Sequence, residues 1–216
     1  MKYFWSMLVL CTGLSIQVYA SDYDTLLMQL QQVKNNPGHL DGALKLGQER
    51  SMLCGYCHGK DGNSVKNYIP NLAQQNAEYL LKQFTMFANG ERKSYVMQQL
   101  SKSLSDVEKI NLALYYSAMN VATVSHAKGS EKGHDKYQSF CFACHGEKGL
   151  GNKDLPRLAG QKKEFLVKTL SAFKDGEKSR STSPMVKIMR TVKVSDIEPL
   201  ADYIASMGAV TDNAGI

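Results

Sequence analysis

The stretch Cys54-Gly55-Tyr56-Cys57-His58-Gly59 returns 87 residues later as Cys141-Phe142-Ala143-Cys144-His145-Gly146, and this repeat decides how the whole chain is interpreted. Each copy has the form C-x-x-C-H. With 5 Cys and 5 His in 216 residues, a single chance occurrence is expected in only about three such chains in a thousand. Two occurrences in two similar segments therefore indicate that the motif has a function.

The spacing within the motif suits a prosthetic group. Two thiols on one helical turn can bond the two vinyl groups of a haem while the adjoining imidazole reaches its iron. His58 and His145 are the expected axial imidazole ligands. The motif thus predicts two covalently bound haem c groups, attached through Cys54, Cys57, Cys141 and Cys144.

Two other uses of paired cysteines fit less well. One structural zinc ion would need both Cys pairs, and a His directly after a ligating Cys points awkwardly for a shared tetrahedron. A thioredoxin-like dithiol has a single C-x-x-C between a strand and a helix, whereas this sequence shows no alternating strand pattern. The haem interpretation is therefore preferred.

The N-terminal stretch indicates export. Residues 1–20 contain one lysine, then an apolar run, then small or neutral residues up to Ala20, which is the form of a secretory signal peptide and is short for a membrane span. Cys11 follows Leu10, where a lipoprotein cleavage site needs a small residue. We expect cleavage near Ala20 and localisation in the Gram-negative periplasm, where c-type haem is attached.

Charge is distributed unevenly along the chain. Removing residues 1–20 takes away one Lys and no acidic residue, so the formal net charge falls from +6 to +5; residues 21–121 carry +1 of this and residues 122–216 carry +4. Such a bias is usually only a solvated face, but in an electron carrier it could orient the second half toward an acidic partner. The expected partners are a redox donor and acceptor, an acidic or membrane-bound oxidase among them, and peripheral membrane association is also compatible with the charge. Nucleic-acid binding is not expected, because an exported chain without a dense Lys/Arg run lacks that partner.

The chain is an internal duplication. Ile69-Pro70-Asn71-Leu72-Ala73-Gln74-Gln75 returns as Leu155-Pro156-Arg157-Leu158-Ala159-Gly160-Gln161, and the match extends over most of both halves at offsets of 86 to 88. Two homologous domains follow. The predicted division is a signal peptide, an N-terminal extension, a first domain, a linker and a second domain, over 1–20, 21–42, 43–121, 122–130 and 131–216.

Helical periodicity predicts an all-α fold. Leu80, Phe84 and Phe87 share one helical face that Gly90 would end, and the second copy repeats this with Leu166, Leu170, Phe173 and Gly176. Capping boxes are expected to open the last helix of each domain, at Ser105–Glu108 and at Ser195–Glu198. Pro199 would then lie in a first turn, where its missing N–H costs little.

The N-terminal extension also has a helical pattern. Leu26, Leu27, Leu30 and Val33 suit a short amphipathic helix that Asn35-Asn36-Pro37-Gly38 would end. Packing against the first domain is the expected role. Shielding of a haem edge and docking of a partner are the alternatives.

A sixth iron ligand must come from downstream of each motif. Met97 plus the terminal-helix offset of 88 lands on Met185, so these two thioethers are the predicted axial ligands opposite the imidazoles. The capping boxes are 90 residues apart, which places Lys187 opposite Met97 instead. Met189 is a further candidate, and each Met has core packing as its alternative role.

The two prolines that recur in the duplicated segments have two possible roles. Pro70 and Pro156 lie twelve and eleven residues after the histidines. Their carbonyls would accept the imidazole Nδ1–H and fix the ring, or the prolines simply form rigid turns. Arg157 is expected either to reach a haem propionate or to be exposed at the surface.

With these residues in view, the chain resembles the dihaem class I cytochromes c of the cytochrome c4 group. The resemblance covers nearly all of residues 43–207 and includes CGYCHG, Pro70-Asn71-Leu72-Ala73, Asn89-Gly90-Glu91-Arg92, Met97 and their second-half counterparts. It implies two tandem cytochrome c folds facing each other about a pseudo-twofold axis. It also implies single-electron delivery in the respiratory chain toward a terminal oxidase or reductase.

The alternatives are two enzyme-related functions and a gas sensor. Met on both irons leaves no free site for a substrate, so an electron carrier without catalysis of its own is expected. A dihaem peroxidase needs one open or openable iron, and so does a gas sensor. A cytochrome subunit of a dehydrogenase would need a separate catalytic partner.

Overall fold

The computed structural model describes residues 23–122, 129–177 and 183–208, which form an all-α molecule. The predicted signal peptide, with its cleavage near Ala20, and most of the predicted linker lie outside these residues. The described chain contains eleven helices: α1 Tyr23–Lys34, α2 Pro37–Arg50, α3 Met52–His58, α4 Ala77–Asn89, α5 Tyr95–Ser103, α6 Asp106–Ser117, α7 Glu131–Phe140, α8 Phe142–His145, α9 Lys163–Lys174, α10 Pro184–Thr191 and α11 Val194–Ser206. None of them is both long and apolar enough to cross a membrane.

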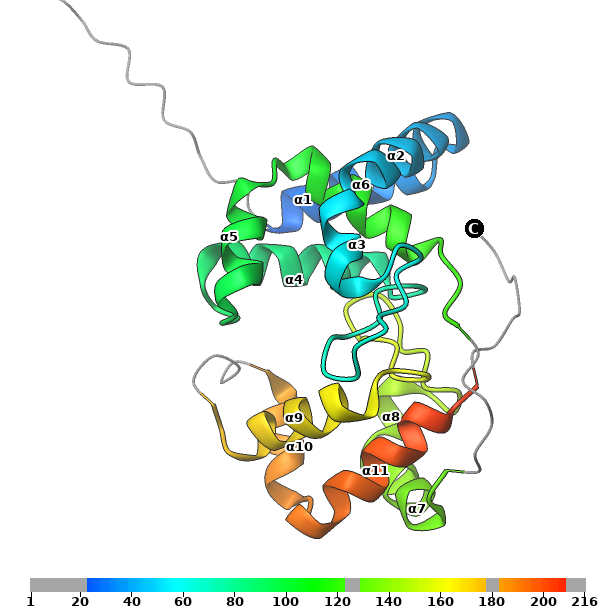
Figure 1. Cartoon of the computed structure of the whole chain (residues 1–216), viewed down its shortest axis with the longest axis vertical. Coiled ribbons are helices and arrows are strands. Elements are labelled where there is room, and N and C mark those ends of the chain that lie inside the picture. Colours follow the sequence, from blue (N-terminus) through cyan, green and yellow to red (C-terminus); the bar gives the residue numbers. More distant parts are fainter. Residues whose placement is uncertain (1–22, 123–128, 178–182, 209–216) are drawn as a thin grey trace, which may run out of the picture.

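The helices form two separate groups. Helices α1–α6 make the upper half in Figure 1 and α7–α11 the lower half, and the loops after α3 and α8 meet between them. Each half has its own hydrophobic core, one built from residues between Leu26 and Tyr116 and the other from residues between Tyr137 and Ile204. The predicted all-α fold with two repeated domains is therefore confirmed.

Equivalent helices form for the predicted reasons. Leu80, Phe84 and Phe87 of α4 are buried in the first half, and α4 ends at Gly90, which adopts the left-handed conformation with φ 82°. Their counterparts, Leu166, Leu170 and Phe173 of α9, are buried in the second half. Burial of one apolar face holds each helix against its own core.

In each half the helix that precedes the C-x-x-C-H motif crosses the last helix at a glycine. Gly47 of α2 lies against Asn111 and Tyr115 of α6, and Gly133 of α7 lies against Pro199 and Tyr203 of α11. A Cβ at either glycine would overlap the facing backbone carbonyl. These two helix pairs form the framework on which the C-x-x-C-H motifs sit.

The second predicted capping box is wrong. Ser105 and Glu108 form both capping bonds at the start of α6, but α11 begins one residue before Ser195, with Lys193 at the N-cap. Pro199 is consequently inside the helix rather than in its first turn. The buried carboxylate of Asp196 provides the negative charge near this helix start instead, and the α7 lysines Lys132 and Lys136 bind it at 2.7 and 3.4 Å.

The predicted helix in the N-terminal extension is confirmed. Leu26 and Leu30 of α1 are buried in the first core, and α1 packs against α2, α4 and α6. Asn36 ends the turn after α1 and caps α2 by accepting a hydrogen bond from the His39 N–H at 3.3 Å. Because α2 starts at Pro37, the helix runs through the predicted boundary at residue 42.

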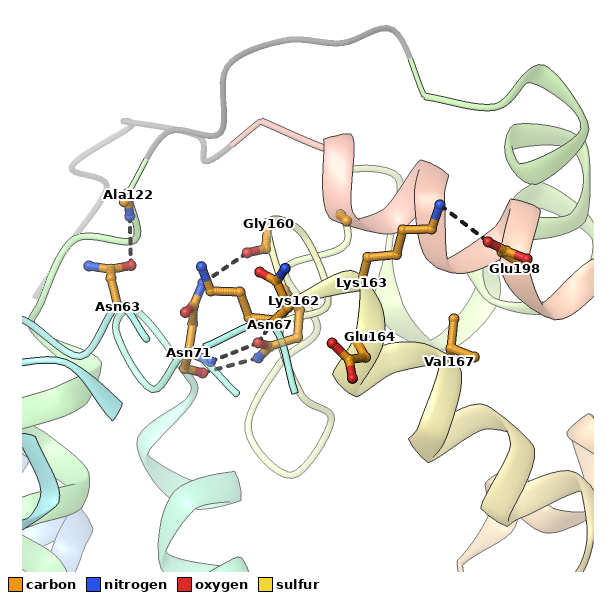
Figure 2. A pocket seen from close by; sticks show the side chains of 12 residues that line it. Asn63, Asn67, Asn71, Ala122, Gly160, Lys162, Lys163, Glu164, Val167 and Glu198 are labelled. Carbon is orange, nitrogen blue, oxygen red and sulfur yellow. Dashed lines mark hydrogen bonds and ion pairs between the residues drawn. The ribbon is translucent and has the colours of Figure 1, made fainter. Parts of the chain in front are cut away.

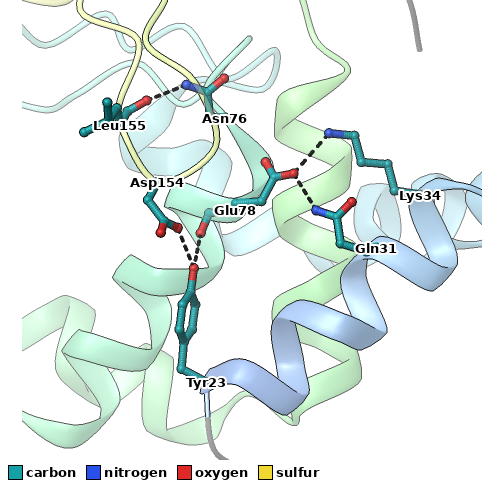
Figure 3. A network of polar contacts seen from close by, with 7 residues as sticks. All are labelled: Tyr23, Gln31, Lys34, Asn76, Glu78, Asp154 and Leu155. Carbon is teal, nitrogen blue, oxygen red and sulfur yellow. Dashed lines mark hydrogen bonds and ion pairs between the residues drawn. The ribbon is translucent and has the colours of Figure 1, made fainter. Parts of the chain in front are cut away.

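Helix α1 also touches the second half. The Tyr23 hydroxyl donates to Asp154 Oδ1 at 2.7 Å, and Asn76 of the first half donates to the carbonyl of Leu155 at 2.6 Å (Figure 3). The nearby Glu78 carboxylate accepts from Gln31 at 2.7 Å. The extension thus packs against the first domain, as expected, and in addition reaches across the contact between the two halves.

Candidate haem sites

The first motif lies on the short helix α3. Cys54 and Cys57 sit one turn apart with free thiols, both partly exposed. His58 closes the helix and is only 9% exposed. The motif therefore presents two thiols and one buried imidazole from a single turn, as a covalently attached haem requires.

The second motif repeats this geometry at the junction of α7 and α8. Cys141 is buried, Cys144 is exposed, and His145 is 4% exposed at the end of α8. Burial raises the pKa of the Cys54 thiol and raises that of Cys141 to about 12. These environments keep both thiols protonated, whereas a catalytic dithiol needs a lowered pKa.

Each histidine ring is held by a proline carbonyl. Nδ1–H of His58 donates to the Pro70 carbonyl at 2.9 Å, and Nδ1–H of His145 donates to the Pro156 carbonyl at 3.0 Å. Of the two roles that the sequence left open, both prolines have the acceptor role. Burial lowers the pKa of both imidazoles, so the neutral form is favoured and Nε2 is the nitrogen left for a metal.

The methionine candidates occupy different environments. Met97, in the first turn of α5, and Met185, in the first turn of α10, are both partly buried at the margins of the two cores. Met189 is 1% exposed within the second core, and Lys187 is exposed. Met97 and Met185 therefore lie at comparable places, three and two residues after the N-cap residues Ser94 and Ser183, whereas Met189 lies inside the second core.

The loops that follow the two motifs meet in a reciprocal contact. Gln161 accepts from the Asn71 N–H at 2.7 Å and donates to the Asn71 carbonyl at 3.0 Å. Gln75 does the same for Arg157, accepting at 2.7 Å and donating at 3.0 Å. All four residues are buried, so the contact between the halves is dry and has the same bonding pattern from both sides.

Arg157 contradicts the expectation of surface exposure. It is 1% exposed, and its guanidinium donates to the carbonyls of Ala73 at 2.9 Å and Gln74 at 3.2 Å in the first half, and to that of Ala159. Burial lowers its pKa to about 10. The physical reason is local: three backbone carbonyls converge there and accept from the planar donor fork.

The two glutamines were not selected from the sequence. Gln75 and Gln161 stand at the same place in the repeated segment, 86 residues apart, and both lie five residues after the proline that accepts from the histidine. Their recurrence was the available sign of a shared role. A recurring polar residue between buried positions is expected to find a hydrogen-bond partner.

A groove of about 610 Å³ lies beside this contact rather than at either motif (Figure 2). Figure 2 shows Asn71 reaching Gly160 across the contact, with a hydrogen bond of 3.1 Å from the Asn71 side chain to the Gly160 carbonyl. Lys163 on the rim pairs with Glu198 at 3.7 Å. The groove lies at the edge of the contact between the two halves, which we call the seam.

Comparison with known proteins agrees with this geometry. The cytochrome c family model matches residues 130–208. Cytochrome c4 of Stutzerimonas stutzeri is 32% identical over 191 residues, which cover 78% of this chain and 91% of that protein. The crystal structure of reduced recombinant cytochrome c4 from Pseudomonas stutzeri matches with a TM-score of 0.69 at 29% identity, over 76% of this chain and 97% of that one.

A second kind of relative is also similar. The thiosulfate dehydrogenase electron acceptor of Stutzerimonas stutzeri strain A1501 is 29% identical over 173 residues. The match covers 73% of this chain and 80% of that protein.

Proposed function

Because the chain belongs to the cytochrome c4 family, we propose that it is a periplasmic dihaem cytochrome that carries single electrons between respiratory-chain components, toward a terminal oxidase or reductase. It carries two covalently bound haem c groups in tandem class I cytochrome c domains. The observation that supports this function most directly is the pair of buried imidazoles, each fixed by one proline carbonyl.

The residues of each motif fit a haem. Cys54 and Cys57 would hold one group, and Cys141 and Cys144 the other, because these thiols are free and stand one turn apart. His58 and His145 would be the axial imidazoles. Met97 and Met185 would supply the thioether on the opposite face, a role that their shared position at the start of α5 and α10 supports.

A bound haem supplies one-electron exchange at its iron, and the protein controls access and potential. Imidazole and thioether would occupy both axial positions, so neither iron offers a place for a substrate. The thioether also favours ferrous iron and raises the reduction potential relative to two imidazoles. The chain itself would therefore transfer electrons without catalysing a reaction.

The domain limits belong to the same proposal. We propose a signal peptide over 1–20, an extension over 21–42 that α2 joins without a break to the first cytochrome c domain, cytochrome c domains over 43–121 and 131–216, and a linker over 122–130. The extension is partly supported by α1, which covers the first core. Export of the chain agrees with covalent haem attachment, which takes place in the periplasm.

A second candidate function is that of an electron-accepting subunit of a dehydrogenase. The similarity to a thiosulfate dehydrogenase electron acceptor favours it. Both functions use the same two haems, and they differ in the partner. The net charge of +4 on residues 122–216 favours an acidic partner surface in either case.

Mass spectrometry of the exported holoprotein tests the assignment of the cysteines. We expect an N-terminus near Ser21 and two covalent haem additions. A Cys54→Ala/Cys57→Ala variant should carry one addition and should keep the spectrum of the second domain. Fewer than two additions on the wild type would contradict the dihaem proposal.

The absence of an open iron is tested separately. The oxidised protein should show the Met–iron charge-transfer band, and the reduced protein should not bind carbon monoxide promptly. Prompt binding at one haem would contradict the carrier proposal and would favour a peroxidase or a sensor. Electron transfer from a candidate dehydrogenase, measured by stopped-flow reduction, distinguishes the two partner assignments.

A further inference from the structure

One peptide group in the first half has a partner on each of its two sides. The Pro70 carbonyl accepts from Nδ1–H of His58 at 2.9 Å, and the N–H of the same peptide, on Asn71, donates to Oε1 of Gln161 at 2.7 Å. His58 and Asn71 belong to the first half, and Gln161 belongs to the second. A hydrogen-bonded chain therefore runs from a side chain of one domain to the imidazole of the other.

The second half contains the mirror arrangement. The Pro156 carbonyl accepts from Nδ1–H of His145 at 3.0 Å, and the Arg157 N–H of that peptide donates to Oε1 of Gln75 at 2.7 Å. Each domain thus lends one glutamine to the histidine of its neighbour. The two hydrogen-bonded chains therefore cross the contact between the domains in opposite directions.

Polarisation and burial make these two hydrogen-bonded chains sensitive to the loss of one partner. A peptide N–H that donates to a good acceptor polarises its own C=O, and that carbonyl then accepts more strongly; condensed-phase estimates put this cooperative effect at about 10–30% per bond. The glutamines and the residues that they bind are buried, at 4–5% exposure for Asn71, Gln75 and Gln161. Exclusion of water increases the effect, because the local dielectric constant is low.

We propose that Gln161 and Gln75 are positioning residues that set the donor strength of the imidazole in the opposite domain, so that the contact between the domains tunes both reduction potentials. The proposal rests on the proposed function, since it takes His58 and His145 as the axial ligands. Gln161 acts on His58, and Gln75 acts on His145. Each glutamine therefore acts on the haem of the domain to which it does not belong; we call this a crossed effect.

The direction of the effect follows from the bonding. A stronger acceptor at Nδ1–H makes the imidazole a better electron donor, which favours ferric iron and lowers the potential. Removal of the glutamine acceptor weakens the carbonyl, weakens the imidazole as a donor, and raises the potential. The rise belongs to the haem of the other domain.

The test is a redox titration in which the two haems are resolved, on holoprotein carrying Gln161→Met or Gln75→Met. We expect Gln161→Met to change the oxidised-to-reduced equilibrium constant of the His58 haem by about threefold, or ~30 mV at 59 mV per tenfold change, with the His145 haem almost unchanged. Gln75→Met should do the reverse. A shift confined to the haem of the altered domain, or an equal shift of both haems, would overturn the proposal, as would no shift at all.

Asn76→Ala is the matched control. Its amide donates across the same seam, to the carbonyls of Leu150 at 3.1 Å and Leu155 at 2.6 Å, but it bonds neither of the peptides that hold the histidines. A general loosening of the contact would appear in this variant as well. We expect Asn76→Ala to shift neither haem potential selectively. A shift of the His145 haem alone, as large as that expected for Gln75→Met, would contradict the proposal.

A second readout reports the hydrogen bond itself. In the reduced, diamagnetic protein, the NMR signal of Nδ1–H of His58 should move upfield in Gln161→Met. Gln161→Glu keeps the acceptor oxygen with a higher charge, so the same signal should move downfield; this variant also carries the test if the Met variant does not fold. Unmoved His58 signals would contradict the inference.

Failure of the inference is distinguishable from failure of the proposed function. If the wild-type protein has two haems and the Met–iron band but the glutamine variants leave both potentials unchanged, only the inference of crossed tuning is wrong. If neither histidine ligates iron in the wild-type protein, the proposed function itself is wrong, and the inference that rests on it is wrong as well.

Discussion

The two halves of the molecule share one backbone design but differ in what they insert at the seam. In the first half the residue after the key proline is Asn71, whose side chain accepts from the Ser64 N–H within its own domain and donates to the Gly160 carbonyl across the contact. In the second half it is Arg157, which places a buried cation among the carbonyls of Ala73, Gln74 and Ala159. The backbone pairing is symmetric, and the electrostatic setting is not.

This difference bears on electron transfer between the two halves. A buried positive charge disfavours ferric iron nearby, and a neutral amide does not. Two domains with matching helices and matching histidine contacts can therefore hold their haems at different potentials. At this position of the seam the asymmetry in charge lies in one side chain, Arg157 in place of Asn71.

The largest expected effect tests whether the two halves ligate iron in the same way. Met97→Ala and Met185→Ala should each lower the potential of one haem only, by on the order of 0.1 V within the roughly 0.8 V that axial ligands span, because loss of the thioether favours ferric iron. A redox titration followed by optical spectroscopy measures this.

Met189→Ala serves as the control for Met185. Met189 is buried in the second core, so its truncation should lower the free energy of unfolding by about 2–5 kcal/mol without moving either potential. A lowered potential in Met189→Ala, with Met185→Ala unchanged, would reassign the ligand of the second domain.

The next effect tests the asymmetry of the seam directly. Arg157→Met removes the buried cation, so at least one of the two haem potentials should fall by several tens of millivolts. One unit charge acting over about 10 Å at an effective dielectric constant of about 20 is worth roughly 2 kcal/mol. Asn71→Ala removes a neutral group at the matching position and should not produce such a fall. Equal shifts in the two variants would show that charge is not the source of the difference.

The two halves also differ in how they hold a buried carboxylate. Glu78 of the first half accepts from Gln31 at 2.7 Å and pairs with Lys34 of the extension at 3.2 Å. Burial alone would raise the pKa of Glu78, but the hydrogen bond from its own backbone N–H, the hydrogen bonds from Gln31 and Lys34 and the Lys34 charge together outweigh it, so the pKa is lowered. In the second half Asp196 pairs with Lys132 and Lys136, and its pKa is also lowered, chiefly by the hydrogen bond from Lys132.

A lowered folded-state pKa fixes the sign of the pH dependence. The stabilisation from Glu78 is present above the pKa of the unfolded chain and is lost as the pH falls through the folded value. Glu78→Gln should lower the free energy of unfolding by about 1–2 kcal/mol at pH 7, and the difference from wild type should shrink between about pH 5 and pH 3. Denaturant unfolding at several pH values measures it, and a difference that grows toward low pH would refute the assignment.

The sequence allowed the local features of each half to be predicted, because they depend on nearby residues. The C-x-x-C-H turns, the apolar faces of α4 and α9 and the helix in the extension all follow from spacing over a few residues. Acceptance by the proline carbonyls was one of two roles that the sequence left open, and it was considered because the prolines recur at nearly the same distance from both histidines. Repetition within one chain supplied that evidence.

The seam was not predictable in the same way. Gln75 bonds to Arg157 and Gln161 bonds to Asn71 across 82 and 90 residues of chain, and no local period reports such pairs. The burial of Arg157 likewise depends on carbonyls that the other domain supplies. Tertiary contact decided these roles, and the recurring glutamines were the one trace of them in the sequence.

The smallest effect concerns the start of the last helix in each half, where equal sequence patterns gave different structures. Ser105 forms a capping box with Glu108, so Ser105→Ala should lower the free energy of unfolding by about 1 kcal/mol. Ser195, in the same sequence pattern, lies inside α11, and Ser195→Ala should change stability by less than about 0.5 kcal/mol. Thermal unfolding of the two holoprotein variants measures both. Equal losses would mean that the second capping box forms after all, and that Asp196 with its two lysines is not what opens α11.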